Sequence, residues 1–275
     1  MKKTLAIITT VYENYETTQD FLTSLTKQKN KNFHLFLINL SESRSPEGWP
    51  NGLPSGVTII KGINKGYAHG INLGLKKAVE DGLENFCVIN NDVFFNDDFV
   101  DKIFSSISKH PSAILGGKIY YAPGFEYHKA KYQPADLGHV LWFAGGKIDW
   151  NHVVTPHRGV DEVDHGQYDF FEKTEFVTGC LMVFDKNVIN KIGYFDESYF
   201  LYYEDADFCV RAQKEKIDLF YDPSIVIWHK NAQSTEGAGS TLHRKYQQKN
   251  RLKFGLKYAP LRTKLHLIKN ILRII

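Results

Sequence analysis

The sequence predicts an α/β fold with a mostly parallel sheet, helices flanking it and a helical C-terminal tail. Three observations predict it: short apolar stretches alternate with segments of helical periodicity, polar or Gly-rich motifs follow those stretches, and residues 243–275 have a helical pattern. With 275 residues, 43% of them hydrophobic, the chain can bury the core of one large or two small domains, which excludes a disordered protein. No apolar stretch is long enough to cross a membrane.

The first half of the chain alternates predicted strands and helices. In the second helix Ile71, Leu75 and Ala78 recur every three or four positions, and Gly82 follows as a C-cap. The predicted strands cover residues 5–11, 33–38, 57–60 and 86–89, and the helices cover residues 15–27, 67–81 and 97–108. In such a sheet, ligands bind beyond the carboxyl ends of the strands.

The second half has a less regular pattern. Residues 120–175 are rich in Gly, Pro, Tyr and His, which indicates an inserted region with at most a short strand at 139–143. We expect strands at residues 176–184, 219–221 and 225–228, a helix at 205–214, and a helical tail that breaks at Pro260. The predicted division is therefore a body, residues 1–240, and a basic amphipathic tail, residues 241–275.

Charge is distributed unevenly along the chain. The net charge is +3, but no Asp or Glu follows Glu236, while ten Lys and Arg lie between Arg244 and Arg273. The tail is thus expected to meet something anionic, unless it is simply a solvated basic helix. Three widely spaced cysteines and the absence of a signal-peptide pattern favour the cytoplasm over an oxidising compartment.

Two motifs follow predicted strands of the first half. Asn90-Asn91-Asp92 places a carboxylate at the expected ligand edge, where it suits a hard divalent cation, although the same residues are common in polar turns. Between Asn64 and Gly74, Gly66 and Gly70 permit close backbone approach at a helix start, where anions bind. A Gly-rich entry into a helix is the simpler alternative.

Two further motifs lie in the second half. Glu204, Asp205 and Asp207 repel one another unless a cation or a reaction uses them, and an aromatic run precedes them as one wall of a pocket. Asp207 can pair with Arg211 along the helix, and acidic residues at a helix start also favour its dipole. His229 follows a strand and is a candidate metal ligand, although a lone His is more often structural.

The tail has one apolar stripe. Its members are spaced four, three, four and three residues apart: Leu261, Leu265, Ile268, Leu272 and Ile275. Lys and Arg lie mostly off the stripe, which is typical of a helix at an anionic membrane surface. Packing on the body or on a second subunit, hence a homodimer, stays open. Nucleic acid is not expected, because no binding motif accompanies the basic residues.

Taken together, these segments resemble the family-2 glycosyltransferases, which have the GT-A fold, and in particular bacterial rhamnosyl- and galactofuranosyltransferases. The resemblance covers about residues 4–255. Its most specific part combines Gly193-Tyr-Phe-Asp196 with Glu204-Asp205-Ala-Asp207 and Arg211. The other matching pieces are Ile7–Tyr12, Asn64–Gly74, Asn90–Asp92, Phe143–Gly146, Val177–Met182 and His229.

The resemblance implies a nucleotide-diphosphate sugar as donor and Mn²⁺ or Mg²⁺ as cofactor. Asp92 looks like the last residue of the family's metal motif, and His229 is similar to its additional metal ligand. Asp205 matches the general base of an inverting displacement, and Glu204 is expected to orient the base or the acceptor. The implied donor-binding residues are Thr10, Tyr12, Asn39, Asn64, Gly66, Asn72, Asn91, Asp92, Thr178 and Gly179.

The chain departs from the family pattern at two positions. Glu13 follows Tyr12 where the family usually has Asn, and Asn39 stands where an Asp usually accepts the N3–H of uracil or thymine. Because an Asn carbonyl also accepts that bond, the donor base stays open.

The expected activity is an inverting, metal-dependent sugar transfer, with a donor half at about residues 1–120 and an acceptor half at 121–240. The expected acceptor is a glycan, in particular a lipid-linked precursor of a bacterial polysaccharide at the cytoplasmic face of the membrane. Two alternatives remain: a soluble glycosyltransferase for a protein or small molecule, and a non-catalytic nucleotide-sugar-binding scaffold.

Overall fold

A computed structural model describes residues 4–13, 15–41, 53–230 and 241–272. The strands of this part form one ten-stranded sheet, and its main path has the order β3-β2-β1-β4-β9-β6-β10-β5. The strand bounds are β1 Leu5–Val11, β2 Phe33–Asn39, β3 Val57–Lys61, β4 Asn85–Ile89, β5 Val93–Phe94, β6 Ile114–Tyr121, β7 Leu141–Phe143, β8 Glu172–Lys173, β9 Leu181–Asp185 and β10 Leu219–His229.

The sheet is parallel from β3 to β4, and β6 and β10 are also parallel. β9 runs antiparallel between β4 and β6, and β5 runs antiparallel to β10. β1 is buried almost throughout because helices cover both faces of the sheet, as its continuous apolar sequence predicts. This arrangement confirms the predicted fold class and brings the carboxyl ends of β1 and β4 to one edge.

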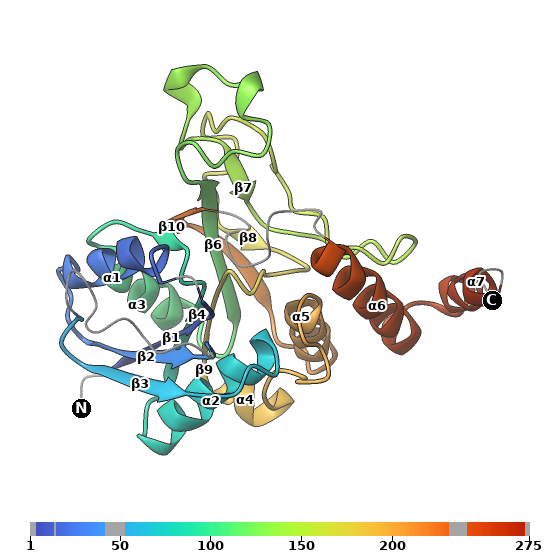
Figure 1. The fold of residues 1–275 in the computed structure, drawn as a ribbon, viewed down its shortest axis with the longest axis horizontal. Helices are drawn as coiled ribbons and strands as arrows, with labels where there is room; N and C mark the ends of the chain where they lie inside the picture. The colour runs from blue at the N-terminus through green and yellow to red at the C-terminus, as the bar shows by residue number, and fades with distance from the viewer. Residues whose placement is uncertain (1–3, 14, 42–52, 231–240, 273–275) are drawn as a thin grey trace.

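Seven α-helices lie in the described part. Their bounds are α1 Thr18–Thr26, α2 Tyr67–Glu80, α3 Phe99–Lys109, α4 Lys186–Ile192, α5 Glu204–Lys214, α6 Thr241–Tyr258 and α7 Leu261–Leu272. α1 and α3 lie on one face of the sheet, and α2 and α4 lie on the other (Figure 1). α5 packs beside α4, and Phe208 on α5 contacts Phe184 of β9 at a ring distance of 5.3 Å. None of the described helices is long and apolar enough to cross a membrane.

The irregular segment between β6 and β9 projects away from the helical layers (Figure 1). It contributes β7, which pairs with β6, and β8, which pairs with β10, so it enlarges one end of the sheet. The predicted insertion at 120–175 therefore corresponds to an extension that joins the same sheet.

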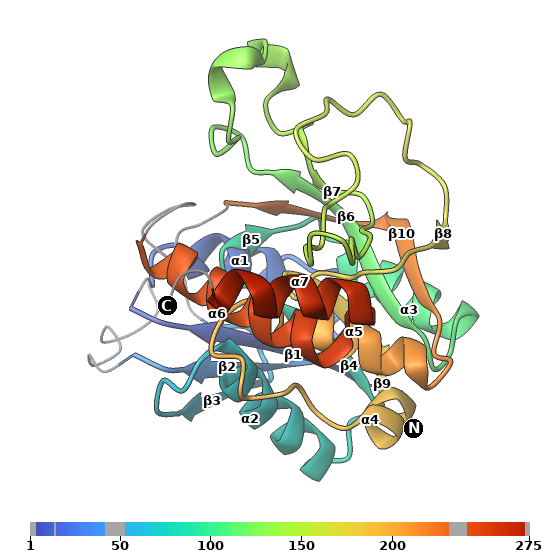
Figure 2. The same cartoon turned by 90° about the vertical axis from the view of Figure 1, so that its right-hand side faces the viewer.

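The tail forms two helices that lie side by side, separated at Pro260 as predicted (Figure 2). Phe254 of α6 is buried on the body, and Leu267 of α7 packs over Gly255. The described members of the apolar stripe, Leu261, Leu265 and Ile268, are instead 72%, 58% and 43% exposed. These three side chains therefore do not pack on the body. Ile275 and the side chain of Leu272 lie outside the described residues.

The predicted elements differ from the observed ones at several places. β6 and α4 were not predicted, and the strands expected at 219–221 and 225–228 form one strand, β10, with an irregularity between Asp222 and Val226. β6 contains Gly116 and Gly117, which lower strand propensity. Both positions need Gly because an added Cβ would lie 2.9 Å from Val177 and 2.4 Å from the carbonyl oxygen of Ile225. The three cysteines are free and buried.

Candidate active site

A pocket of ≈ 1040 Å³ lies at the carboxyl ends of β1 and β4. Its walls come from the loops after these strands, the start of α2, the insertion, the start of α5, the end of β10 and residues 244–251 of α6. This volume is at the upper end of the usual range for ligand sites. The pocket therefore lies at the ligand edge that the strand order predicted.

Asp92 and His229 form a buried pair in this pocket. His229 ends β10 and pairs with Val93 of β5, and the Lys230 amide donates to the carbonyl of Asp92 (2.9 Å), so the backbone sets the two side chains side by side. Asp92 Oδ1 and His229 Nε2 are 3.2 Å apart. Burial alone raises the pKa of Asp92, but His229 outweighs it and holds that pKa below its ordinary value. Burial lowers the pKa of His229, but the neighbouring Cys180 and Asp92 raise it well above normal.

This pair fits a divalent cation that it shares with a substrate. His229 Nδ1 is buried without a hydrogen-bond partner, and Asp92 Oδ1 has only its 3.2 Å contact with His229 Nε2. Buried polar atoms that are not fully satisfied by the protein are suited to hold a ligand or ion. A carboxylate and an imidazole are suitable ligands for Mn²⁺, and a carboxylate also suits Mg²⁺. Among the described residues no cluster of three or more His, Cys, Asp or Glu could hold a metal alone. The remaining ligands would thus have to come from elsewhere, such as the oxygens of a bound diphosphate.

Glu204 and Asp205 enter the pocket at the first turn of α5. The Gly179 amide donates to Asp205 Oδ2 (3.0 Å) and the Ala206 amide donates to Oδ1 (2.8 Å), whereas Glu204 Oε2 is buried without a partner. Burial raises the pKa of both carboxyls, and the charge of Asp205 raises that of Glu204 further. Because more backbone amides stabilise the carboxylate of Asp205 than that of Glu204, and the charge of Asp205 raises the pKa of Glu204, Asp205 ionises first and Glu204 keeps the proton.

The turn that leads into α5 is strained. Tyr202 and Tyr203 both have positive φ (70° and 72°), a conformation that costs energy in residues other than Gly. Asn250 on α6 stabilises it, because its side-chain amide donates to the carbonyls of Leu201 (2.8 Å) and Tyr202 (3.1 Å). α6 therefore helps to place Glu204 and Asp205.

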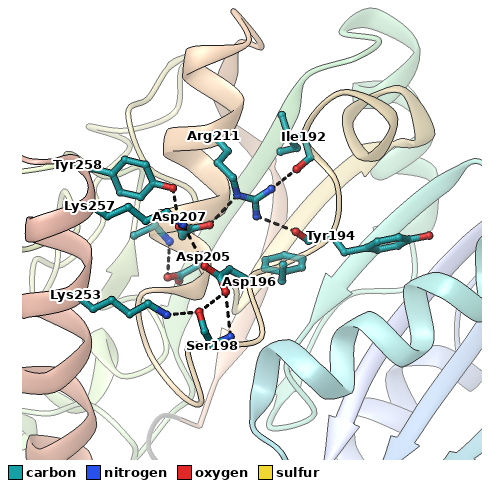
Figure 3. A network of polar contacts seen from close by, with 12 residues as sticks. Ile192, Tyr194, Asp196, Ser198, Asp205, Asp207, Arg211, Lys253, Lys257 and Tyr258 are labelled. Carbon is teal, nitrogen blue, oxygen red and sulfur yellow. Dashed lines mark hydrogen bonds and ion pairs between the residues drawn. The ribbon is translucent and has the colours of Figure 1, made fainter.

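A second set of polar contacts joins α6 to α5 (Figure 3). Asp207 is fully buried and accepts from Arg211 Nε, Lys257 Nζ and the Tyr258 hydroxyl, each at 2.7 Å. The sequence predicted the Asp207–Arg211 pair, which is confirmed, but not the two partners from α6. Lys253 on α6 also contacts Ser198 in the loop before α5 (Figure 3).

The start of α2 is locked to the loop that precedes α5. Gly66 has φ = 102°, and a Cβ there would lie 2.2 Å from the carbonyl oxygen of Phe200, to which the Tyr67 amide donates (2.8 Å). The Tyr67 hydroxyl donates to the carbonyl of Gly179 (2.8 Å). Only Gly permits this close approach, so the Gly-rich motif joins two walls of the pocket.

Most predicted site residues line this pocket. They are Thr10, Tyr12, Asn64, Gly66, Asn91, Asp92, Thr178, Gly179, Glu204, Asp205 and His229. Asn39 and Asn72 do not. Asn39 Oδ1 accepts from the Ser41 amide (3.0 Å), and Asn72 bonds to the backbone of Phe195. These two amides hold loops together in the structure, and their roles in donor binding stay predictions.

The sequence did not indicate several residues that line the pocket. Trp142 and His157 come from the insertion, where no periodicity marks individual positions, and only its aromatic content could have indicated a binding wall. His157 Nδ1 donates to the carbonyl of Trp142 (3.0 Å), and burial lowers the pKa of His157 to about 4. It is therefore a neutral imidazole. Cys180 adjoins His229, and Arg244 and Arg251 come from α6, which was assigned to the tail.

Curated relatives are glycan-building transferases. The chain is 25% identical over 162 residues to the low-salt glycan biosynthesis hexosyltransferase Agl10 of Haloferax volcanii, covering 58% of this chain and 47% of Agl10. It is 24% identical over 250 residues to the N-acetylglucosaminyl-diphospho-decaprenol L-rhamnosyltransferase of Mycobacterium tuberculosis, covering 86% and 78%. The chain is also 23% identical to the dTDP-rhamnosyl transferase RfbF of Shigella flexneri. This match covers 62% of this chain and 51% of RfbF. The match thus spans about half the length of Agl10 and RfbF.

Solved structures share the fold. GalNAc-T7 with UDP, GalNAc and Mn²⁺ has a TM-score of 0.63 at 14% identity over 88% of this chain and 47% of that chain. The mannosyltransferase PcManGT from Pyrobaculum calidifontis with GDP-Man and Mn²⁺ has a TM-score of 0.55 at 12% identity over 96% and 69%. These similarities confirm the GT-A architecture. The family model "Glycosyl transferase family 2" matches residues 6–193, more than half of the sequence, and the chain therefore belongs to glycosyl transferase family 2.

Proposed function

We propose that this protein transfers a sugar from a nucleotide-diphosphate donor to a hydroxyl group of a glycan acceptor, with inversion at the anomeric carbon. One observation carries the proposal: the buried Asp92–His229 pair and the Glu204–Asp205 pair line the same pocket. A metal-binding pair and a carboxylate base in one cavity provide the two groups that such a displacement needs. A binding scaffold would need no base.

The chemistry follows from the two carboxyls of α5. Asp205, which carries the charge, takes the proton of the acceptor hydroxyl while that oxygen bonds to the anomeric carbon. The bond from this carbon to the diphosphate breaks on the opposite side, so the configuration inverts and the nucleoside diphosphate leaves. Protonated Glu204 is a hydrogen-bond donor beside the base and orients the acceptor.

The donor diphosphate belongs beside Asp92 and His229. When bound there, Mn²⁺ or Mg²⁺ supplies Lewis acidity that stabilises charge on the departing diphosphate. The buried His229 Nδ1, which has no hydrogen-bond partner, supports this assignment, and the two structural neighbours are described with Mn²⁺. Thr10, Tyr12 and Asn64 also line the pocket, near the end of β1 and before the start of α2.

The acceptor we propose is a lipid-linked glycan precursor at the cytoplasmic membrane surface. The mycobacterial relative is named for a diphospho-decaprenol acceptor. In addition, α7 exposes Leu261, Leu265 and Ile268 and contains no acidic residue, as an interfacial helix requires.

The test combines donor binding with Asp205→Asn. The wild-type protein is screened by thermal shift against UDP-, dTDP- and GDP-sugars with Mn²⁺ or EDTA, and nucleoside diphosphate release is then measured with the donor that binds. Asp205→Asn should keep donor binding and lose about 10²- to 10⁴-fold in transfer rate. Glu215→Gln, an exposed acid at the other end of α5, is the matched control. Transfer by Asp205→Asn near the wild-type rate would show that Asp205 is not the base.

A further inference from the structure

A segment of α6, residues 244–251, forms one wall of the pocket. Five of its residues line the cavity: Arg244, Tyr246, Gln247, Gln248 and Arg251. Among the described lining residues, Arg244 and Arg251 are the only Lys or Arg side chains, while Asp92, Glu204 and Asp205 are acidic. The positive charge of the cavity wall thus comes from the segment that sequence analysis separated from the body.

This wall adjoins the base. Asn250 bonds to the two carbonyls just before Glu204, and the Tyr246 ring stacks on Phe200 of the same loop at 4.8 Å. Lys257 and Tyr258 fix the other end of α6 to Asp207 (Figure 3). The contacts of α6 with α5 and with the loop before it therefore fix the part of α6 that contains Arg244 and Arg251. Because an acceptor must reach Asp205, this side of the pocket belongs to the acceptor.

The cations of this wall are available to a ligand. Among the described residues no carboxylate forms an ion pair with Arg244, Lys245 or Lys249, all of which are exposed. Arg251 Nε donates to the carbonyl of His152 (2.8 Å). Arg244, Lys245, Gln248 and Lys249 also line a second hollow, which shares Arg244 and Gln248 with the main pocket. The basic surface of α6 thus continues from the pocket into this shallow depression.

We propose that this basic surface of α6 binds the phosphate or diphosphate group of the acceptor. The inference rests on the proposed function, whose acceptor it specifies. Guanidinium and ammonium groups at neighbouring positions match the oxygens of a diphosphate, and Arg binds such groups in a bidentate manner. The acceptor then binds at two places. Its sugar hydroxyl lies at Asp205, and its phosphate lies on α6. The donor diphosphate stays with Asp92 and His229.

The test uses farnesyl diphosphate as the probe, because it carries the diphosphate and an isoprenoid without a sugar. Binding is measured by calorimetry in EDTA, so that the metal pair is not loaded. The wild type should bind the probe, and Arg244→Gln/Lys249→Gln should weaken binding at least about tenfold, as expected for the loss of two charge-assisted bonds. Arg262→Gln/Lys269→Gln on α7 removes the same charge and should bind like the wild type. Farnesol, which lacks phosphate, should not compete.

Three results would overturn the inference. The first is equal probe affinity in the α6 double variant and the wild type, or no binding by either. The second is a tenfold loss of nucleoside diphosphate binding in Mn²⁺ by the α6 variant, which would assign the cations to the donor. The third is a loss of binding to phosphatidylglycerol vesicles with unchanged probe affinity, which would assign them to lipid headgroups. Failure of the proposed function itself is seen separately, as absence of Mn²⁺-dependent donor cleavage by the wild type.

Discussion

Replacing Glu204 by Gln should stabilise the protein at neutral pH. Glu204 is 5% exposed, its Oε2 has no hydrogen-bond partner, and the charged Asp205 is its neighbour. Burial and this charge raise its pKa well above the ordinary value of 4.5. Folding must therefore keep a proton on Glu204 at pH values where the unfolded chain releases it.

The magnitude follows from proton linkage. Below pH 4.5 both states hold the proton, and Glu204 then has no ionisation cost. Above this pH the unfolded state ionises first, so the free energy of unfolding falls by about 1.4 kcal/mol per pH unit until the folded-state pKa is reached. Gln cannot ionise, so the advantage of Glu204→Gln should grow by about 1.4 kcal/mol per pH unit over this window. For a chain of this size, about 1 kcal/mol corresponds to roughly 2–4 °C in Tm.

The assay is thermal unfolding of the wild type and Glu204→Gln at pH 5, 6, 7 and 8. Glu215→Gln, which changes an exposed acid at the end of the same helix, should show no growing difference. A Tm difference that is constant with pH, or that shrinks as pH rises, would refute the assignment of the proton to Glu204. Transfer by Glu204→Gln, measured in parallel, should stay near the wild-type rate, because the Gln amide keeps a neutral hydrogen-bond donor where protonated Glu204 has one.

Two further predictions concern the contacts that hold the pocket walls together. Gly66→Ala should destabilise the protein by more than the roughly 1–3 kcal/mol of backbone strain alone, because its Cβ would overlap Phe200, and thermal unfolding measures the loss. Gly193→Ala, with φ = 73° and nothing near its Cβ, should show the strain without the overlap, and equal losses would contradict this account. Tyr258→Phe removes one bond to buried Asp207 and should lower the free energy of unfolding by about 1.5–3 kcal/mol in urea titrations. A loss below about 0.5 kcal/mol would mean that Asp207 is satisfied without it.

Local pattern was sufficient where one physical cause dominated. The buried strands β1, β2 and β4 are continuous apolar runs, and α2 and α5 have clear starts and periodicity, so their sequences predicted them. β6 was missed because Gly116 and Gly117 are selected by close contacts with Val177 and Ile225, which no local pattern reveals. Local strand propensity does not include contacts with residues that are distant in the sequence.

For the site, the sequence by itself determined the chemistry available: a carboxylate after β4, an acidic helix start and a His after a late strand. The rule for strand ends then indicated one common edge. Only the tertiary structure decided the pairings, because the antiparallel contact of β5 with β10 brings Asp92 to His229. It also decided that α6 belongs to the pocket, since Lys257 and Tyr258 reach Asp207 across the interface of two helices. Such contacts depend on helix packing, and a one-dimensional pattern does not contain that information.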